Sequence, residues 1–155
     1  LVPVDEAKGT RDITISRSDV ENLIRTKGAI YAAIDTLVQS VGITIQDITR
    51  IHIAGAFGNK LDPSSCIGIG LLPDVPVDRI NFIGNSSVAG AKMALVDRKW
   101  LEKIGQIRDS VTYQELMVDP DYMEKYTSAC FLPHTDTSSF PSVMKRLEDT
   151  RKGQV

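Results

Sequence analysis

Residues 50–62, RIHIAGAFGNKLD, decide the fold of this chain. Ile51 and Ile53 bracket His52, and this alternation of apolar and polar side chains predicts a strand. The run then breaks into a glycine-bearing turn and reaches an Asp-Pro pair at residues 62 and 63. Asp before Pro is typical of a helix cap followed by a first-turn proline. The stretch therefore predicts a strand, a turn, and a short helix that runs to about residue 69 and ends at Gly70.

A long amphipathic helix is predicted over residues 17–41. Ser16 stands three residues before Asp19, which is the spacing of a reciprocal helix cap, and apolar side chains then recur at three- and four-residue steps. Gly42 follows where a C-terminal cap needs a left-handed residue. Lys27 and Gly28 interrupt this helix, although Gly costs about 1 kcal/mol there relative to Ala. Close packing of the helix on the sheet and a nucleotide contact by Lys27 both remain open explanations.

Strand and helix patterns alternate along the chain. Residues 12–16 (DITIS), 50–54 and 77–84 (VDRINFIG) read as strands, and residues 44–48 (TIQDI) as a short turn or helix. A helix should run from about residue 87 past residue 94, with residue 103 or 104 as its outer limit. Further on, residues 111–116 (VTYQEL) predict a strand, 120–129 a helix, 133–142 a loop, and 143–152 a polar helix. This alternation predicts one α/β domain over residues 1–155, with a mostly parallel sheet flanked by helices.

Composition narrows the kinds of partner. The chain has 155 residues, 25% of them charged, and a formal net charge of -2, so it lacks the basic footprint of a protein that binds nucleic acid or an anionic membrane. The absence of a long apolar run and of a signal peptide leads to the expectation of a soluble, cytoplasmic protein. The two cysteines, Cys66 and Cys130, are expected to be buried, reduced thiols. The missing initiator Met suggests a fragment of a longer protein.

Two loops follow consecutive predicted strands, at residues 54–59 (AGAFGN) and 84–90 (GNSSVAG). In a parallel sheet, ligands bind beyond the carboxyl ends of the strands, where glycines let the backbone approach them. Ordinary strand-to-helix turns are the alternative. Phe57 is expected to be a core anchor under the first loop, with a flat face for a purine as the alternative, and the serines could be helix caps. The candidate binding residues are Lys27, Gly28, Gly55, Ala56, Phe57, Gly58, Asn59, Gly84, Asn85, Ser86, Ser87 and Gly90.

Residues 12–38 (DITISRSDVENLIRTKGAIYAAIDTLV) and 51–95 (IHIAGAFGNKLDPSSCIGIGLLPDVPVDRINFIGNSSVAGAKMAL) closely resemble a known family. It is the C-terminal ATPase region of the reductive activators of corrinoid proteins. These activators are iron–sulfur ATPases of the acetate and sugar kinase, Hsp70 and actin superfamily. The resemblance implies most of the second lobe of an actin-like ATPase, RNase H-like in fold, with a core at 12–105 and a C-terminal extension at 106–155.

The resemblance also implies a function for the parent protein. Family members couple ATP hydrolysis to the reduction of cob(II)alamin to cob(I)alamin in a partner corrinoid protein. They bind ATP with Mg²⁺ and carry a [2Fe–2S] cluster in an N-terminal domain. The loop from Gly55 to Gly58 matches the superfamily's adenosine motif, the loop from Gly84 to Gly90 follows on the next strand, and the helix containing Lys27 would flank the adenine.

Other parts of the family pattern are absent from the sequence. No Asp-Gly-Thr phosphate loop occurs, residues 7–10 (AKGT) are not one, and two cysteines cannot hold a cluster that typically needs four ligands. The chain therefore offers no catalytic residue and no metal ligand, and by itself it is not expected to hydrolyse ATP.

Two alternatives to the activator hypothesis remain. One is a lobe of a metabolite kinase from the same superfamily. The other is a module that docks the corrinoid protein or a second activator copy through residues 111–141. His134 in that tail is expected to face solvent rather than to bind cobalt. Contact anchors for such docking would be Tyr113, Tyr122, Tyr126, Phe131 and Phe140, although core packing is the expected fate of most.

Overall fold

The computed structural model describes residues 1–153 except 7–8, 10 and 56–57. Its centre is a parallel pair of strands, β1 (Ile51–Ala54) and β2 (Ile80–Gly84), with Ile51 opposite Ile80 and Ala54 opposite Gly84. Both strands and their parallel direction confirm the prediction. Among the described residues the sheet has two strands, so it is smaller than the alternating pattern suggested.

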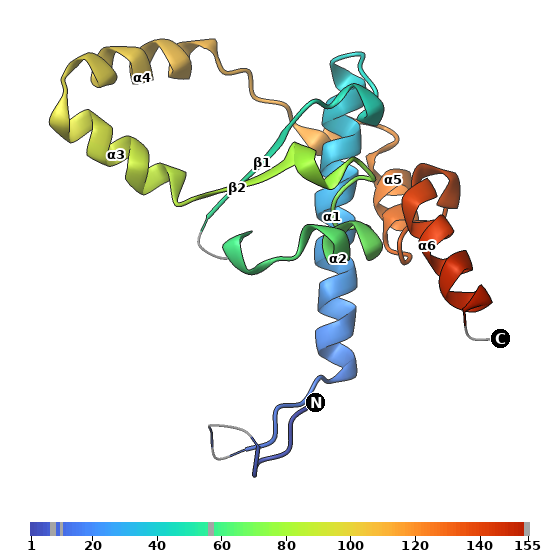
Figure 1. Ribbon diagram of the computed structural model, residues 1–155. Helices are drawn as coiled ribbons and strands as arrows, with labels where there is room; N and C mark the ends of the chain where they lie inside the picture. The colour runs from blue at the N-terminus through green and yellow to red at the C-terminus, as the bar shows by residue number, and fades with distance from the viewer. Residues whose placement is uncertain (7–8, 10, 56–57, 154–155) are drawn as a thin grey trace.

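Helix α1 (Arg17–Ser40) stands as a long rod behind the strands (Figure 1). It begins at the predicted reciprocal cap, in which the backbone N–H of Ser16 donates to the Asp19 carboxylate at 2.8 Å and the backbone N–H of Asp19 donates to the Ser16 hydroxyl at 3.2 Å. The helix ends where Gly42 adopts a φ of +72°. The sequence prediction of this helix is confirmed at both ends.

Five further helices and five short 3-10 turns complete the described chain. The helix α2 (Pro63–Gly68) starts from the carboxylate of Asp62, which accepts the backbone N–H of Ser65 at 2.7 Å. The other helices are α3 (Ser86–Val96), α4 (Lys99–Ser110), α5 (Tyr122–Ala129) and α6 (Pro141–Lys152). The 3-10 turns are η1 (Ile45–Asp47), η2 (Gly58–Lys60), η3 (Val77–Arg79), η4 (Leu116–Val118) and η5 (Thr137–Ser139).

The core lies where α1, α2, α5 and α6 meet the start of β2. Helix α5 packs along α1, and Phe140, just before α6, is fully buried with its ring 5.4 Å from that of Tyr31. The buried apolar cluster consists of Tyr31, Cys66, Ile67, Leu72, Val75, Ile80, Ala129, Phe140 and Val143. Most of the apolar burial therefore sits on one side of the strands.

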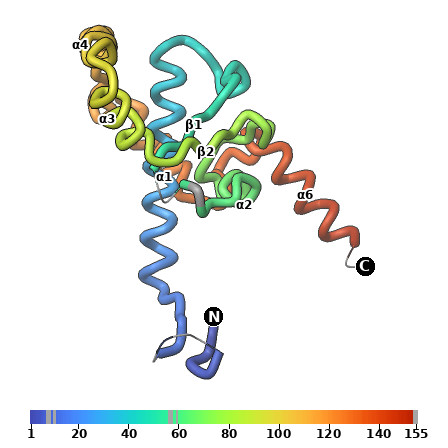
Figure 2. The backbone as a smooth tube through the Cα atoms, turned by 60° about the vertical axis from the view of Figure 1, so that its left-hand side comes forward, coloured from blue at the N-terminus to red at the C-terminus, as the bar shows by residue number. Residues whose placement is uncertain are grey.

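Helices α3 and α4 form an arm on the other side. In both views they lie across the strands from α6 and reach away from the rest of the chain (Figures 1 and 2). None of their residues is fully buried. Among the described residues, no helix combines the length and the apolar character that crossing a bilayer requires.

Several sequence predictions of secondary structure are wrong. Residues 12–16 contain only an isolated antiparallel bridge between Ile13 and Val2, and residues 111–116 form no strand. Both segments have alternating sequences, but neither has a neighbouring strand in the described part of the chain, and a strand needs a partner for its backbone. Residues 77–79 form a 3-10 turn rather than the start of β2.

The helix predicted from about residue 87 past residue 94 is confirmed as α3, but it does not reach residue 103 or 104, where the chain forms the separate helix α4. Asp97 adopts an extended backbone after α3, and its carboxylate accepts the backbone N–H of Lys99 at 2.9 Å. This bond favours a new helix start over continuation, because a short acidic side chain competes for nearby backbone donors. The predicted starts of α5 and α6 were each off by two residues, as these helices begin at Tyr122 and Pro141, whereas their predicted ends are confirmed.

Candidate functional site

The two predicted loops meet at the carboxyl ends of the parallel strands. The backbone N–H of Gly55, directly after β1, donates to the carbonyl of Gly84, the last residue of β2, at 2.7 Å. The register of the strand pair shifts between Ile53 and Ala54, just before this contact. Because the strands are parallel, both chains leave the sheet at the same edge, which is where open α/β sheets bind ligands.

Both glycines adopt backbone conformations that L-residues rarely take. The φ of Gly55 is +106° and that of Gly84 is +65°. A Cβ atom built on Gly55 would meet no described atom within 4 Å, so the space beside this backbone is open. The turn therefore needs glycine for its geometry, and the bare backbone leaves room for a ligand to approach.

Gly58 serves the packing beneath this loop. It is buried, and a Cβ there would lie only 2.8 Å from Cγ2 of Ile53 on β1. Ala56 and Phe57 lie outside the described residues, as does the side chain of Asn59, so the choice between core anchor and purine platform for Phe57 stays a prediction. Lys60, which the sequence reasoning did not single out, follows in η2 and is exposed.

Asn85 in the second loop, rather than a serine, is the N-cap of helix α3. The side-chain oxygen of Asn85 accepts the backbone N–H of Val88 at 3.1 Å. Ser86 and Ser87 are the first two residues of α3, both are exposed, and neither hydroxyl hydrogen-bonds to another described residue. Gly90 lies one turn further on and is half-buried, and a Cβ on it would meet no described atom within 4 Å.

Gly55, Gly84 and the start of α3 together form a corner that can hydrogen-bond an anionic or polar ligand. Two serine hydroxyls stand beside the amino end of an eleven-residue helix, where backbone N–H groups lack intrahelical partners and the helix dipole favours negative charge. Together with the open backbone of Gly55, the donor set fits the sugar and phosphate groups of a nucleotide. Among the described residues no group of acidic, histidine and cysteine side chains could hold a metal ion.

Lys27 belongs to a different part of the molecule. Its side chain is fully buried, and its ammonium donates hydrogen bonds to the carbonyls of Phe131 and Pro133, the latter at 2.6 Å. Burial lowers the pKa of Lys27 to about 8. The structure therefore ties this lysine to the segment after α5, and a contact between Lys27 and a nucleotide base stays a prediction.

Gly28 allows α1 and α5 to pack closely. A Cβ on Gly28 would lie 3.0 Å from the sulfur of Cys130 and 3.5 Å from the backbone of Ala129. Close packing was one of the two explanations for the break in the helix pattern, but the partner is α5 rather than the sheet. Gly70, with a φ of +73°, sits against the same segment, and its Cβ would lie 2.0 Å from the carbonyl oxygen of Pro133.

The contacts of Lys27, Gly28 and Gly70 with residues 129–133 form a junction between α1, α5 and the segment after α5. The two thiols and His134 lie near this junction. Both cysteines are free; Cys66 is buried, which raises the pKa of its thiol, whereas Cys130 is only half-buried. Two thiols do not fit an iron–sulfur cluster, which typically needs four ligands. His134 is half-buried rather than solvent-facing, its Nδ1 accepts the backbone N–H of Asp136 at 3.0 Å, and burial lowers its pKa.

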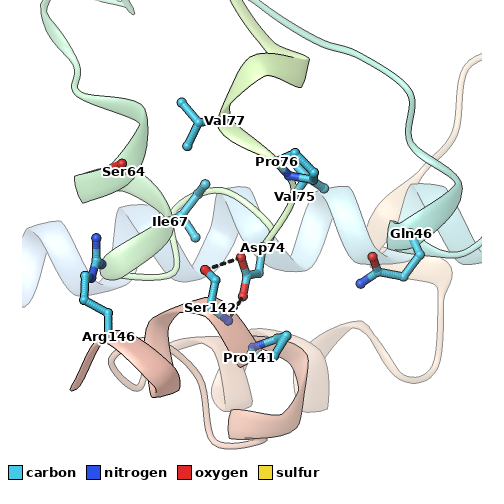
Figure 3. A pocket seen from close by; sticks show the side chains of 10 residues that line it. All are labelled: Gln46, Ser64, Ile67, Asp74, Val75, Pro76, Val77, Pro141, Ser142 and Arg146. Atoms are coloured by element: carbon cyan, nitrogen blue, oxygen red, sulfur yellow. Dashed lines mark hydrogen bonds between the residues drawn. The ribbon is translucent and has the colours of Figure 1, made fainter. Parts of the chain in front are cut away.

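One polar contact was missed by the sequence reasoning. The buried carboxylate of Asp74 accepts the backbone N–H and the hydroxyl of Ser142, at 2.7 and 2.6 Å, and so holds the start of α6 (Figure 3). It borders a cavity of about 390 Å³ between α2, α6 and the turn before β2, which Arg146 also lines. The two residues are 68 positions apart and no motif marks them, so sequence spacing gave no signal.

Residues 1–144 match the protein family described as the C-terminal domain of RACo, the ASKHA domain. The chain belongs to this family. A solved structure titled reductive activator for corrinoid,iron-sulfur protein shares 41% sequence identity, with a TM-score of 0.88 over 92% of this chain and 23% of that one. These matches confirm the predicted α/β fold class of the chain and its predicted relationship to the reductive activators of corrinoid proteins.

Two curated relatives agree with this assignment. The corrinoid activation enzyme RamQ of Eubacterium limosum is 34% identical over 126 residues, which are 81% of this chain and 21% of that protein. The [Co(II) methylated amine-specific corrinoid protein] reductase of Methanosarcina barkeri is 30% identical over 106 residues, or 68% of this chain and 19% of that protein. The chain thus spans about a fifth of the length of these relatives.

Proposed function

We propose that this chain is the nucleotide-binding lobe of an ATP-dependent reductive activator of a corrinoid protein. The observation that carries the proposal is the hydrogen bond between Gly55 and Gly84, which joins both candidate loops into one corner at the ligand-binding edge of the sheet. The names of the relatives, a corrinoid activation enzyme and a corrinoid protein reductase, supply the reaction and the partner class.

Within this proposal the chain has a limited share of the chemistry. Gly55, Gly84 and the start of α3 hold the nucleoside and phosphates, with Gly58 and Asn85 fixing the two loops beneath them. ATP, with Mg²⁺, supplies the free energy for an unfavourable one-electron reduction of Co(II) to Co(I). Phosphoryl transfer needs positioned charges on both sides of the phosphates, and those of the other side, like a [2Fe–2S] cluster, belong to other parts of the longer protein.

The test is the ATP-dependent reduction of a Co(II) corrinoid protein by the longer protein that contains this chain. The absorption of Co(I) should appear with ATP and a low-potential electron donor, and should not appear when ATP is omitted. Reduction at the same rate without ATP would contradict the proposal. Phosphorylation of a small metabolite in place of cobalt reduction would favour the metabolite kinase alternative.

A docking role for the C-terminal tail remains a second candidate. Of its proposed aromatic anchors, Phe140 is in the core, but Tyr113 is 81% exposed and Phe131 is also exposed. Removing both exposed rings with Tyr113→Ser and Phe131→Ser should weaken capture of the corrinoid protein if the tail docks it. Unchanged capture would leave the tail with a structural role alone.

A further inference from the structure

Helices α3 and α4 carry apolar surface that no described residue covers. Between residues 88 and 96 of α3, only Gly90 and Lys92 are not apolar, and Leu95 and Val96 are 86% and 87% exposed. A helix that is apolar all round belongs in an interior. Here it lies in an arm that reaches away from the core (Figure 2).

Helix α4 continues this surface with one apolar stripe. Leu101, Ile104 and Ile107 recur every third residue, and each has about half of its surface exposed. Lys99, Glu102, Lys103, Gln106, Arg108 and Asp109 are charged or polar positions of the same helix. Apolar stripes opposite charged faces are typical of helices that lie on an apolar partner, and a soluble chain rarely exposes so large a patch without one.

The longer relatives indicate what that partner is. The match to the solved structure covers 92% of this chain, so the unmatched residues are too few to include both helices of the arm. That solved chain is about four times as long as this one. The family is described as a C-terminal domain, so most of such a polypeptide lies before it. A surface this apolar also suits a permanent contact better than a transient one, since obligate interfaces are the more hydrophobic class.

We propose that the polypeptide that precedes this domain in the longer protein packs on the α3–α4 arm and covers its apolar surface. The covering segment presents an apolar face to Leu101, Ile104 and Ile107 of α4 and to Leu95 and Val96 at the end of α3. Since α3 starts at Ser86 in the candidate nucleotide corner, a segment packed on the arm would link that corner to the preceding part of the protein through a single helix. The inference concerns the arm alone and stands whether or not the corner binds ATP.

Amide hydrogen exchange on the longer protein, without nucleotide and at a concentration where it is monomeric, tests the proposal. The amides of α4 should exchange at least roughly tenfold more slowly than those of an uncovered surface helix. Ile107→Glu should restore fast exchange in α4, whereas Gln106→Glu adds the same charge on a polar position and should leave it slow. The amides of β1 serve as the internal reference that each variant has folded.

Each other outcome overturns the proposal. Fast exchange of α4 in the unaltered longer protein would show that nothing covers the arm. Protection that is lost on dilution, together with a change from dimer to monomer, would assign the arm to a second copy. Protection that appears only when the corrinoid protein is added would make the arm a docking surface for that partner.

Discussion

The junction around Lys27 and the corner at Gly55 and Gly84 show two different uses of similar residues. At the junction, glycines and a buried lysine bring α1, α5 and the segment after α5 into contact. An added Cβ would collide with backbone at Gly70 and crowd the sulfur of Cys130 at Gly28. At the corner, Gly55 faces open space and the hydroxyls of Ser86 and Ser87 lack partners among the described residues. The first region holds the fold together, and the second is open to a ligand.

The largest expected effect comes from filling the junction. Gly70→Ala would place a Cβ 2.0 Å from the carbonyl oxygen of Pro133, at a φ of +73°. We expect a loss of about 4 kcal/mol or more in the free energy of unfolding, because backbone must move on both sides. Urea denaturation followed by circular dichroism measures it. Stability equal to that of the unaltered chain would show that the segment after α5 is not fixed against Gly70.

Removing the buried ammonium should have the next largest effect. Lys27→Met leaves the carbonyls of Phe131 and Pro133 without their donor, which should cost about 2–4 kcal/mol in the free energy of unfolding. Lys145→Met makes the same change at an exposed position of α6 and should stay within about 0.5 kcal/mol of the unaltered chain. Equal losses in both variants would contradict the structural role of Lys27.

The same lysine predicts a pH dependence. Its pKa falls from 10.5 to about 8 on folding, so between these values the unfolded chain binds more protons than the folded one. Burying the charged Lys27 therefore lowers the free energy of unfolding. This loss is fully present below about pH 8 and is relieved as the pH rises toward 10.5. The stability of the unaltered chain minus that of Lys27→Met should therefore increase over this range. A flat difference would mean that the lysine titrates normally.

The candidate site was more accessible to sequence reasoning than the junction was. Residues 50–62 and 84–90 are each local patterns, and the rule that parallel strands present their carboxyl ends together predicted that they meet. Lys27 was singled out as an interruption, but its partners lie 104 and 106 residues away and are backbone carbonyls, which leave no mark in the sequence. The contact between Asp74 and Ser142 was hidden for the same reason.

The wrong strand predictions have a related cause. Alternation at residues 12–16 and 111–116 describes a segment that could pair, but pairing needs a neighbour, and the described chain provides only Val2 opposite Ile13. The division between α3 and α4 depended on the competition of one aspartate for a backbone donor. Such choices among local bonds are too finely balanced for periodicity to resolve.

A small effect is expected in the arm. Gly105→Ala in α4 meets no described atom within 4 Å, and Ala is favoured over Gly in a helix by about 1 kcal/mol. In this chain, amide exchange within α4 should slow by roughly fivefold, as expected from that difference if the helix opens locally. Faster exchange in the variant would mean that Gly105 is needed for its backbone conformation.

The central claim is that Gly55 lines a nucleotide site, and ATP affinity in the longer protein tests it most directly. Gly55→Val should abolish ATP binding by blocking the open backbone, raising the Kd at least about a hundredfold. Gly42→Val is the matched control, since Gly42 also has a positive φ and open surroundings but ends α1 away from the two loops. Circular dichroism should show both variants folded. Normal ATP affinity in Gly55→Val would contradict the account.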